Sequence, residues 1–344
     1  MGCMIVPPYL LLRIAQLEDP RLAGAAAAAR RALLHDMPFR GVREELRPHE
    51  PVTGAGPGPQ RTIFDADQTE NLPGRIVRLE GGAATGDRAA DEAYDAFGHT
   101  HRLFSEVYSR ASVDDQNLPL PGTVHYGDAY DNAFWDGTRM VFGDGDGQVF
   151  TRFTASLSVI GHELAHGVTQ YTANLVYRGQ SGAVNESISD VFGALVEQHT
   201  ANQTTDTASW LIGEGLFTDQ VEGNALRSLK APGTAYDDDV LGKDPQPDHM
   251  DGFVDTQDDN GGVHLNSGIP NRAFYLVAET LGGHAWERAG RIWYDTLTGG
   301  TLTANSDFAG FADATTDAAR TRFGSDSAER HAVEHAWATV GVTR

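Results

Sequence analysis

The pentad His162-Glu163-Leu164-Ala165-His166 places two imidazoles four residues apart. On a helix such residues lie on one face, about one turn apart, so both rings can reach a single ion. Zinc suits two neutral imidazoles and a carboxylate, with a fourth position left for water. Glu163 would lie to the side of that metal, where its carboxylate can take a proton from the water. The pentad alone leaves open a surface helix that happens to carry two histidines.

A third ligand is available in the segment 182–190, Gly-Ala-Val-Asn-Glu-Ser-Ile-Ser-Asp. Its carboxylates, Glu186 and Asp190, are four residues apart and again share a helical face. One of them can bind zinc while the other orients a ligand imidazole through its second nitrogen. The apolar neighbours Val184 and Ile188 indicate a buried helix. The two segments together predict a zinc site with three protein ligands and an open fourth position.

These segments resemble the zinc-binding segments of the thermolysin-like metalloprotease family, and further matches follow in the same order over about residues 60–344. The resemblance implies one catalytic zinc held by His162, His166 and Glu186, with Glu163 as the general base. It also implies that Asn185 and Asp190 hold the two ligand histidines. The activity implied is that of a neutral endopeptidase acting on peptide or protein substrates.

Three further segments and the single residue Tyr177 carry the resemblance. Residues 130–135, Tyr-Asp-Asn-Ala-Phe-Trp, resemble the family's substrate-binding edge strand, on which Asn132 and Ala133 would hydrogen-bond a peptide as one more strand. Residues 260–268 resemble the segment of the family's transition-state histidine, here His264. Asp259 would orient its imidazole.

Two more side chains complete the implied machinery. Arg227 matches an arginine that binds the substrate carbonyl, and Tyr177 matches a phenol that helps to hold the oxyanion. The resemblance also implies an apolar pocket and cleavage before bulky hydrophobic residues. Its lining would be Phe150, Phe153, Val159, Leu216 and Leu226. Phe153 is larger than the aliphatic residue expected there, which leaves the size preference open.

Each motif has a structural alternative when taken alone: core aromatics, a structural histidine or a surface cation. Their common order makes these readings improbable together. A zinc aminopeptidase would need an acidic anchor for a free amine, whereas residues 132–135 are Asn-Ala-Phe-Trp. The remaining alternative is a zinc-binding but catalytically silent regulatory or binding protein. A purely structural zinc site would use four protein ligands and no neighbouring base.

Calcium is expected to play a smaller part than in many relatives. The carboxylates of the family's double calcium site would fall at Ser158, Glu197, Ser209, Leu211 and Glu214. Two glutamates cannot supply the six to eight oxygens that calcium takes, so the sequence predicts that this site is absent. The Asp-rich loop over about 230–262 is expected to be a solvated charged loop, with weak calcium binding as the alternative.

The elements that would position these groups indicate an α+β fold of thermolysin-like, two-domain form. A β-rich unit is expected over residues 53–172, ending in the zinc-binding helix, and a helical unit over 173–344. Strands are expected at 62–64 and 75–79 and a helix at 91–108. Later helices are expected at about 155–171, 185–200, 267–281, 285–297, 306–323 and 327–339, with N-caps at Ser306 and at Ser325 or Ser327 and stops at Gly282, Gly299 and Gly324.

The N-terminal stretch 1–52 reads as a separate helical unit followed by a Gly- and Pro-rich linker at 51–59. It resembles the short propeptide of the protealysin-type branch through the motif Pro7-Pro8-Tyr9-Leu10. The resemblance implies an inhibitory propeptide that covers the cleft in cis until it is removed. A helical extension without an inhibitory role is the alternative. The sole cysteine, Cys3, excludes an intrachain disulfide and could in principle ligate the zinc.

Charge limits the partners further. The net charge of −22 over 344 residues argues against nucleic acid and anionic membranes. The first residues carry no basic start and the apolar stretch is broken by Pro7-Pro8, so no signal peptide is expected. The sequence leaves the compartment, the oligomeric state and the natural substrate open.

Overall fold

The computed structural model describes residues 3–40 and 58–342. Its N-terminal half is built on a six-stranded mixed sheet in the order β1-β5-β6-β4-β2-β3. The pairs β2–β4 and β4–β6 are parallel, and the other neighbours are antiparallel. The strands are β1 (Cys3–Met4), β2 (Arg61–Asp65), β3 (Arg75–Leu79), β4 (Leu120–Val124), β5 (Ala133–Trp135) and β6 (Met140–Phe142).

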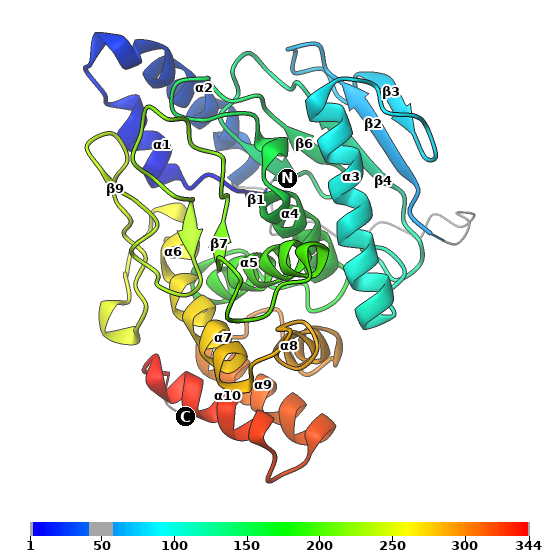
Figure 1. The fold of residues 1–344 in the computed structure, drawn as a ribbon. Helices are drawn as coiled ribbons and strands as arrows, with labels where there is room; N and C mark the ends of the chain where they lie inside the picture. Colours follow the sequence, from blue (N-terminus) through cyan, green and yellow to red (C-terminus); the bar gives the residue numbers. More distant parts are fainter. Residues whose placement is uncertain (1–2, 41–57, 343–344) are drawn as a thin grey trace.

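Helix α3 (Arg88–Arg102) packs on this sheet and against α4, and a π-helical turn at Leu103–Val107 continues it (Figure 1). The side chain of Asp87 caps α3 by accepting a hydrogen bond from the Ala90 amide. Alanines and Phe97 form an apolar face of α3, and this face is buried against the strands. The helix expected at 91–108 is therefore present and starts one turn earlier.

The C-terminal half is mostly helical, and its helices stack below the sheet in Figure 1. They are α4 (Leu157–Gln170), α5 (Gly179–Ala201), α6 (Asp259–Asn266), α7 (Gly268–Leu281), α8 (Ala289–Thr298), α9 (Phe308–Phe323) and α10 (Ala328–Thr339). Two short hairpin pairs join them: β7 (Leu211–Ile212) with β8 (Arg227–Ser228), and β9 (Asp237–Asp238) with β10 (Gly242–Lys243).

Helices α4 and α5 cross at glycines, and this crossing sets the site. A Cβ on Gly193 of α5 would lie 2.4 Å from the Ser158 carbonyl oxygen of α4. A Cβ on Gly161 of α4 would lie 3.1 Å from the Gly193 Cα. Glycine at both places lets the backbones approach closely. Both helices are buried along nearly their whole length, so their polar side chains must find partners in the interior.

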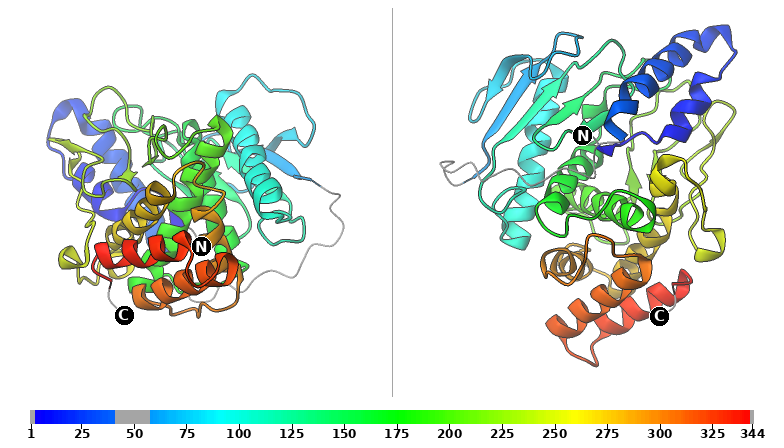
Figure 2. Two further views of the ribbon diagram at one scale, coloured as in Figure 1. Left: turned by 60° about the horizontal axis from the view of Figure 1, so that its bottom comes forward. Right: turned by 180° about the vertical axis from the view of Figure 1, so that it is seen from behind.

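The N-terminal unit consists of β1 and two helices, α1 (Pro8–Ala15) and α2 (Ala23–Arg40), joined through a 3₁₀ turn at Pro20–Leu22. The helices lie on the outside of the molecule, whereas β1 runs into its middle, beside β5 and α4 (Figures 1 and 2). Pro7 and Pro8 begin α1, which suits proline because the first helical amides need no intrahelical partner. The side chain of Cys3 and the linker 51–57 lie outside the described residues.

The α+β fold is confirmed, with three corrections. Ser306 is not the N-cap of α9, because the neighbouring Asp307 side chain accepts the Gly310 amide. Ser327 does cap α10. Helix α5 starts at Gly179, ahead of the expected 185. The Asp-rich loop is not fully solvated, because Asp244 is 3% exposed and accepts three backbone amides.

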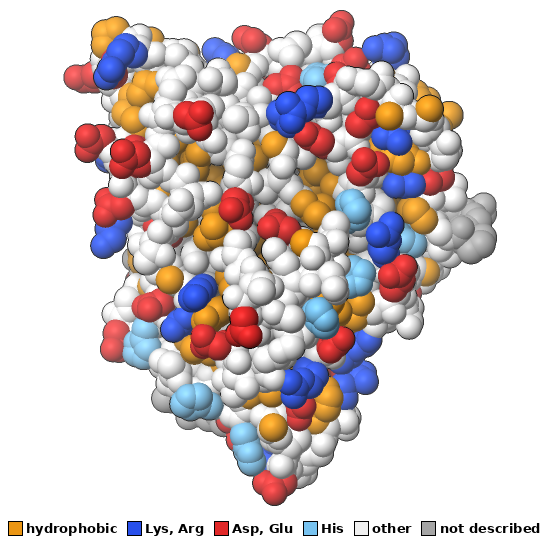
Figure 3. All heavy atoms as spheres, viewed as in Figure 1, with side chains coloured by type: hydrophobic (Ala, Val, Ile, Leu, Met, Phe, Trp, Pro, Cys, Tyr) orange, Lys and Arg blue, Asp and Glu red, His pale blue; other side chains and the backbone are white. Residues whose placement is uncertain are grey.

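On the face that Figure 3 presents, acidic and basic side chains are interspersed. Within residues 3–40 and 58–342, no helix is long and apolar enough to cross a membrane.

Candidate active site

Helices α4 and α5 bring three potential metal ligands together. His162 and His166 lie one turn apart on α4, with their Nε2 atoms 3.0 Å apart. Glu186 on α5 places its carboxylate oxygens 3.6 Å from the first Nε2 and 3.3 Å from the second. All three side chains are buried. This is the arrangement that the two sequence motifs predict.

The donor chemistry of the triad fits a cation. His162 Nδ1 donates to Asp190 Oδ1 at 2.8 Å, and His166 Nδ1 donates to Asn185 Oδ1 at 2.9 Å. These bonds fix both rings in the tautomer whose Nε2 carries a lone pair. Two lone pairs facing one another at 3.0 Å repel unless a cation lies between them. Ser189 also lies 2.9 Å from His166 Nδ1 and was missed, although it stands in the same segment.

Asp190 is itself held by a cation and an amide. Arg227 binds it with two nitrogens, Nε to Oδ2 and Nη2 to Oδ1, each at 2.9 Å. Asn271 on α7, which the sequence analysis missed, donates to Oδ2 at 2.8 Å. Burial opposes the charge of Asp190, but Arg227 and His162 outweigh it and lower the pKa of Asp190 to about 2. Asp190 therefore stays ionised and keeps His162 oriented.

Glu163 and Tyr177 flank the triad. Glu163 is fully buried on α4, and its Oε2 accepts the Trp135 amide of β5 at 3.0 Å. Tyr177, in the loop before α5, donates its hydroxyl to Glu186 Oε1 and lies 3.2 Å from His264 Nε2. The Glu163 carboxylate and the Tyr177 hydroxyl are thus held in the same part of the interior as the metal ligands.

A tight backbone turn folds Asp259 onto His264. Asn260, Gly261 and Gly262 all have positive φ, which glycine adopts freely. Asp259 accepts the His264 amide at 2.9 Å and lies 2.6 Å from its Nδ1. Nε2 of the same ring lies 3.0 Å from the Met4 carbonyl oxygen, which can only accept. Both ring nitrogens face acceptors, so the ring must carry two protons.

Electrostatics agree with that protonation. Burial would lower the pKa of His264, but the Asp259 and Glu186 carboxylates outweigh it, and the pKa of His264 is raised. The imidazolium presents an N–H donor toward the space beside the triad. The arrangement can therefore supply a base on one side of a peptide carbonyl and two donors on the other.

Comparisons with known proteins decide the family. Residues 61–170 match the model of the thermolysin metallopeptidase catalytic domain, and residues 173–342 match that of its alpha-helical domain. The chain belongs to the thermolysin metallopeptidase family. An extracellular metalloprotease of Pectobacterium carotovorum subsp. carotovorum is 52% identical over 342 residues, which span 99% of this chain and 96% of that protein. A thermolysin of Alicyclobacillus acidocaldarius is 42% identical over 266 residues, 75% of this chain and 46% of that protein.

A solved structure matches over the whole length. It is the precursor of protealysin, a metalloproteinase from Serratia proteamaculans, with a TM-score of 0.90 and 50% identity over 99% of this chain and 100% of that one. The chain is thus a metalloendopeptidase of the thermolysin family, similar in structure to a family precursor. Family membership implies zinc as the metal of the His-His-Glu triad.

The chain's own N-terminal segment lies beside the triad, against β5 and His264. Strand β1 pairs antiparallel with β5, with Cys3 opposite Trp135 and Met4 opposite Phe134. Ile5 donates its amide to the Ala133 carbonyl at 3.1 Å, and Val6 donates its amide to Asn132 Oδ1 at 2.9 Å. The Ile5 carbonyl accepts from Arg227 Nη1 at 3.0 Å.

Tyr9 and Leu10 of the propeptide motif follow this segment in α1. The Tyr9 phenol is buried, and desolvation, with Tyr236 and Asp244 nearby, raises its pKa well above the usual range. Leu10 is 1% exposed. Asp36 on α2 accepts from the Tyr130 hydroxyl at 2.8 Å and from Asn132 Nδ2 at 3.1 Å. Sequence reasoning missed Asp36, because no motif in α2 signals a contact about 95 residues away.

The expected apolar pocket residues are all in the core. Phe150, Phe153, Val159 and Leu216 are fully buried, and Leu226 is 1% exposed. The Phe150 and Phe153 rings pack with their centroids 5.6 Å apart.

Two of the positions expected for the family's double calcium site are hydrogen-bonded within the chain. Ser158 accepts the Gly213 amide at 3.2 Å and is hydrogen-bonded to Glu197. Burial is the main cause that raises the pKa of Glu197.

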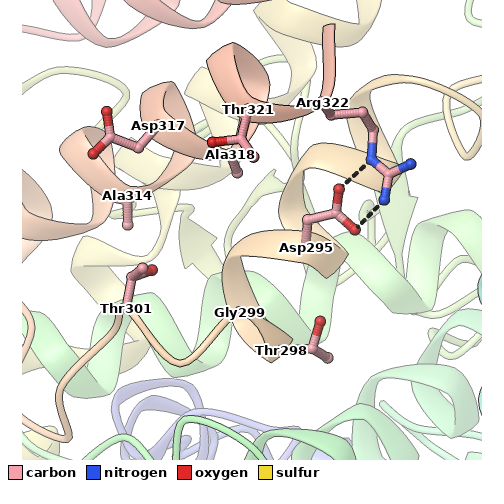
Figure 4. A pocket seen from close by; sticks show the side chains of 9 residues that line it. All are labelled: Asp295, Thr298, Gly299, Thr301, Ala314, Asp317, Ala318, Thr321 and Arg322. Atoms are coloured by element: carbon pink, nitrogen blue, oxygen red, sulfur yellow. Dashed lines mark hydrogen bonds and ion pairs between the residues drawn. The ribbon is translucent and has the colours of Figure 1, made fainter.

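A hollow of about 550 Å³ lies apart from the triad, between α8 and α9 (Figure 4). Its charged pair, Arg322 and Asp295, is closed on itself by hydrogen bonds. Figure 4 shows Asp317 and small threonine and alanine side chains around the rest of the hollow, and Asp317 pairs with Arg320. Nothing in it converges on a ligand.

Proposed function

We propose that this chain is the precursor of a zinc-dependent neutral endopeptidase, kept latent by its own N-terminal segment in cis. The observation that carries the proposal is the Met4 carbonyl, which lies within 3.0 Å of His264 Nε2 beside the His162-His166-Glu186 triad. A peptide laid over the triad in this way supports both a peptide-hydrolysing site and its blockade by residues 3–6.

Zinc bound by His162, His166 and Glu186 would act as a Lewis acid toward water and the substrate carbonyl. Glu163 takes a proton from the attacking water and delivers it to the leaving amine. His264 and Tyr177 donate to the oxygen on which negative charge develops, a contribution of about 3 kcal/mol for one such donor. Asp259 holds His264 in the donating form.

The same backbone contacts support the binding of substrates as an added strand. Asn132 and Ala133 bond the amides of an extended chain, and Arg227 bonds a carbonyl. The five apolar residues expected to line the pocket are buried, which supports a preference for a bulky hydrophobic residue after the scissile bond. Ile5, which is fully buried, holds that position in the closed precursor.

We further propose that the chain needs no double calcium site. Ser158 and Glu197 are hydrogen-bonded to each other at positions where calcium ligands would be needed. A calcium chelator should leave the thermal midpoint unchanged, whereas a decrease of several degrees would contradict the proposal.

The endopeptidase proposal is tested with peptides of mixed sequence and a mass-spectrometric map of the products. After cleavage between α2 and β2, the wild-type chain should cut before Leu, Ile and Phe. A zinc chelator should abolish cutting, and Glu163→Gln should slow it by at least a hundredfold. One bound zinc without hydrolysis by any trimmed form would instead support the silent zinc-binding alternative.

A further inference from the structure

One peptide group of the N-terminal segment lies at the metal triad. The Met4 carbonyl oxygen is 3.0 Å from His264 Nε2, and that nitrogen is 3.5 Å from Glu186 Oε2 and 3.2 Å from the Tyr177 hydroxyl. The peptide bond that follows this carbonyl joins Met4 to Ile5. It is therefore the bond whose carbonyl faces the donors of the site.

Hydrogen bonds on both sides of this bond fix its register. The Ile5 amide is held by the Ala133 carbonyl, and the Ile5 carbonyl is held by Arg227. The next amide, of Val6, is held by Asn132 Oδ1. Three consecutive groups are bonded to separate parts of the chain: β5, the residue just before it, and β8. A shift by one residue would break all three bonds and turn Ile5 out of the interior.

The general base Glu163 is bound to the strand that pairs with the residues before this bond. Glu163 Oε2 accepts the amide of Trp135, the residue that pairs with Cys3. Glu163 is thus joined to β5 at the residue opposite Cys3, and the His264 ring lies at the Met4 oxygen. The segment is therefore bound in the orientation of a substrate.

We infer that the Met4–Ile5 bond is a self-cleavage site, presented in cis to the active site of the precursor. The inference rests on the proposed function. One water is consumed: its oxygen adds to the Met4 carbonyl carbon, the C–N bond breaks, and Glu163 carries the proton to the Ile5 nitrogen. The products are residues 1–4 with a new carboxyl group and a chain that begins at Ile5.

The cut does not by itself open the cleft. Arg227 still binds the Ile5 carbonyl, and Asn132 still binds the Val6 amide after the bond is broken. Helix α2 also remains attached through Asp36. The trimmed propeptide is therefore a bound product, and latency persists until the chain is cut between α2 and β2.

The test uses the full-length chain, purified without metal and then loaded with zinc. Intact mass and N-terminal sequencing should show a new N-terminus at Ile5, whether or not Met1 was removed beforehand. The rate should be first-order and independent of protein concentration. Glu163→Gln should be at least a hundredfold slower. Ile5→Leu should still be cut, whereas Ile5→Pro, which has no amide hydrogen for Ala133, should not.

A second readout needs no catalysis. In the Glu163→Gln chain, slow hydrogen exchange at both the Ile5 and the Val6 amides is expected from their hydrogen bonds. Fast exchange at both would overturn the register. An intact Met4–Ile5 bond in a preparation that hydrolyses test peptides once it is cut between α2 and β2 would overturn the self-cleavage site and leave the proposed function standing. A rate proportional to protein concentration would overturn cleavage in cis.

Discussion

Replacing Ile5 with alanine should weaken the hold of the N-terminal segment on the cleft. The Ile5 side chain is 0% exposed in the closed precursor and meets water when the segment leaves. Truncating a buried isoleucine to alanine costs about 2–5 kcal/mol, and that cost falls on the closed state alone. The closed-to-open equilibrium should therefore move toward the open form by about 30-fold to about 5000-fold.

The assay is hydrolysis of a quenched peptide by the zinc-loaded chain with an intact linker. Residual activity is expressed as a fraction of the activity after linker cleavage. This fraction should rise by the same factor, up to a maximum of one. Leu12→Ala is the matched control, because Leu12 belongs to the same propeptide but is 49% exposed. Equal residual activities for Ile5→Ala and Leu12→Ala would refute the reasoning.

Three other substitutions test separate contacts. Asp36→Ala leaves Tyr130 and Asn132 without their buried acceptor in the closed state. This loss costs the closed state about 2–3 kcal/mol, so the same residual activity should rise roughly 30- to 150-fold. Unchanged residual activity would exclude Asp36 from latency. The hydrogen bond that His125 donates to the Asp144 carboxylate, reinforced by Asp87, raises the pKa of His125 to about 9. The stabilisation from this bond is therefore complete below pH ~6.5 and is lost as the pH rises through about 9. Solvent screening reduces this to about 1–2 kcal/mol; urea unfolding of the Glu163→Gln chain should show that loss, and adding His125→Gln should remove it. Burial, with the neighbouring Asp146 carboxylate, raises the pKa of Asp131 well above its usual range, so the stability that depends on its proton falls as the pH rises above ~4. Asp131→Asn should raise the urea midpoint at pH 8 and not at pH 4; equal shifts at both would contradict a protonated Asp131.

Local spacing made the metal centre predictable. His162, His166 and Glu186 follow from helical periodicity and ligand chemistry, and Asp190 lies one turn from Glu186 on the same face of α5. The α+β division followed from the change in hydrophobic period along the chain. His264 and Tyr177 came through the resemblance alone, and their contacts with the Met4 carbonyl and Glu186 were not predictable.

Contacts between distant segments could not be predicted in the same way. Asp36 reaches Tyr130 through the packing of α2 on the outside of the sheet, and nothing local in α2 marks it. The register of Met4 opposite Phe134 depends on how the whole propeptide docks. The error at Ser306 has a local cause, because a neighbouring aspartate also caps well and the backbone turn decides between them.

The most direct test of the central claim, a zinc endopeptidase held latent by its own N-terminus, is one time course. Peptidase activity per bound zinc is followed while the full-length chain is cut between α2 and β2, with the Glu163→Gln chain in parallel. Almost no activity is expected before the cut, followed by a rise in step with release of the propeptide, and none is expected from Glu163→Gln. An uncut chain as active as the cut one would contradict latency, and a cut, zinc-loaded chain without activity would contradict the enzyme.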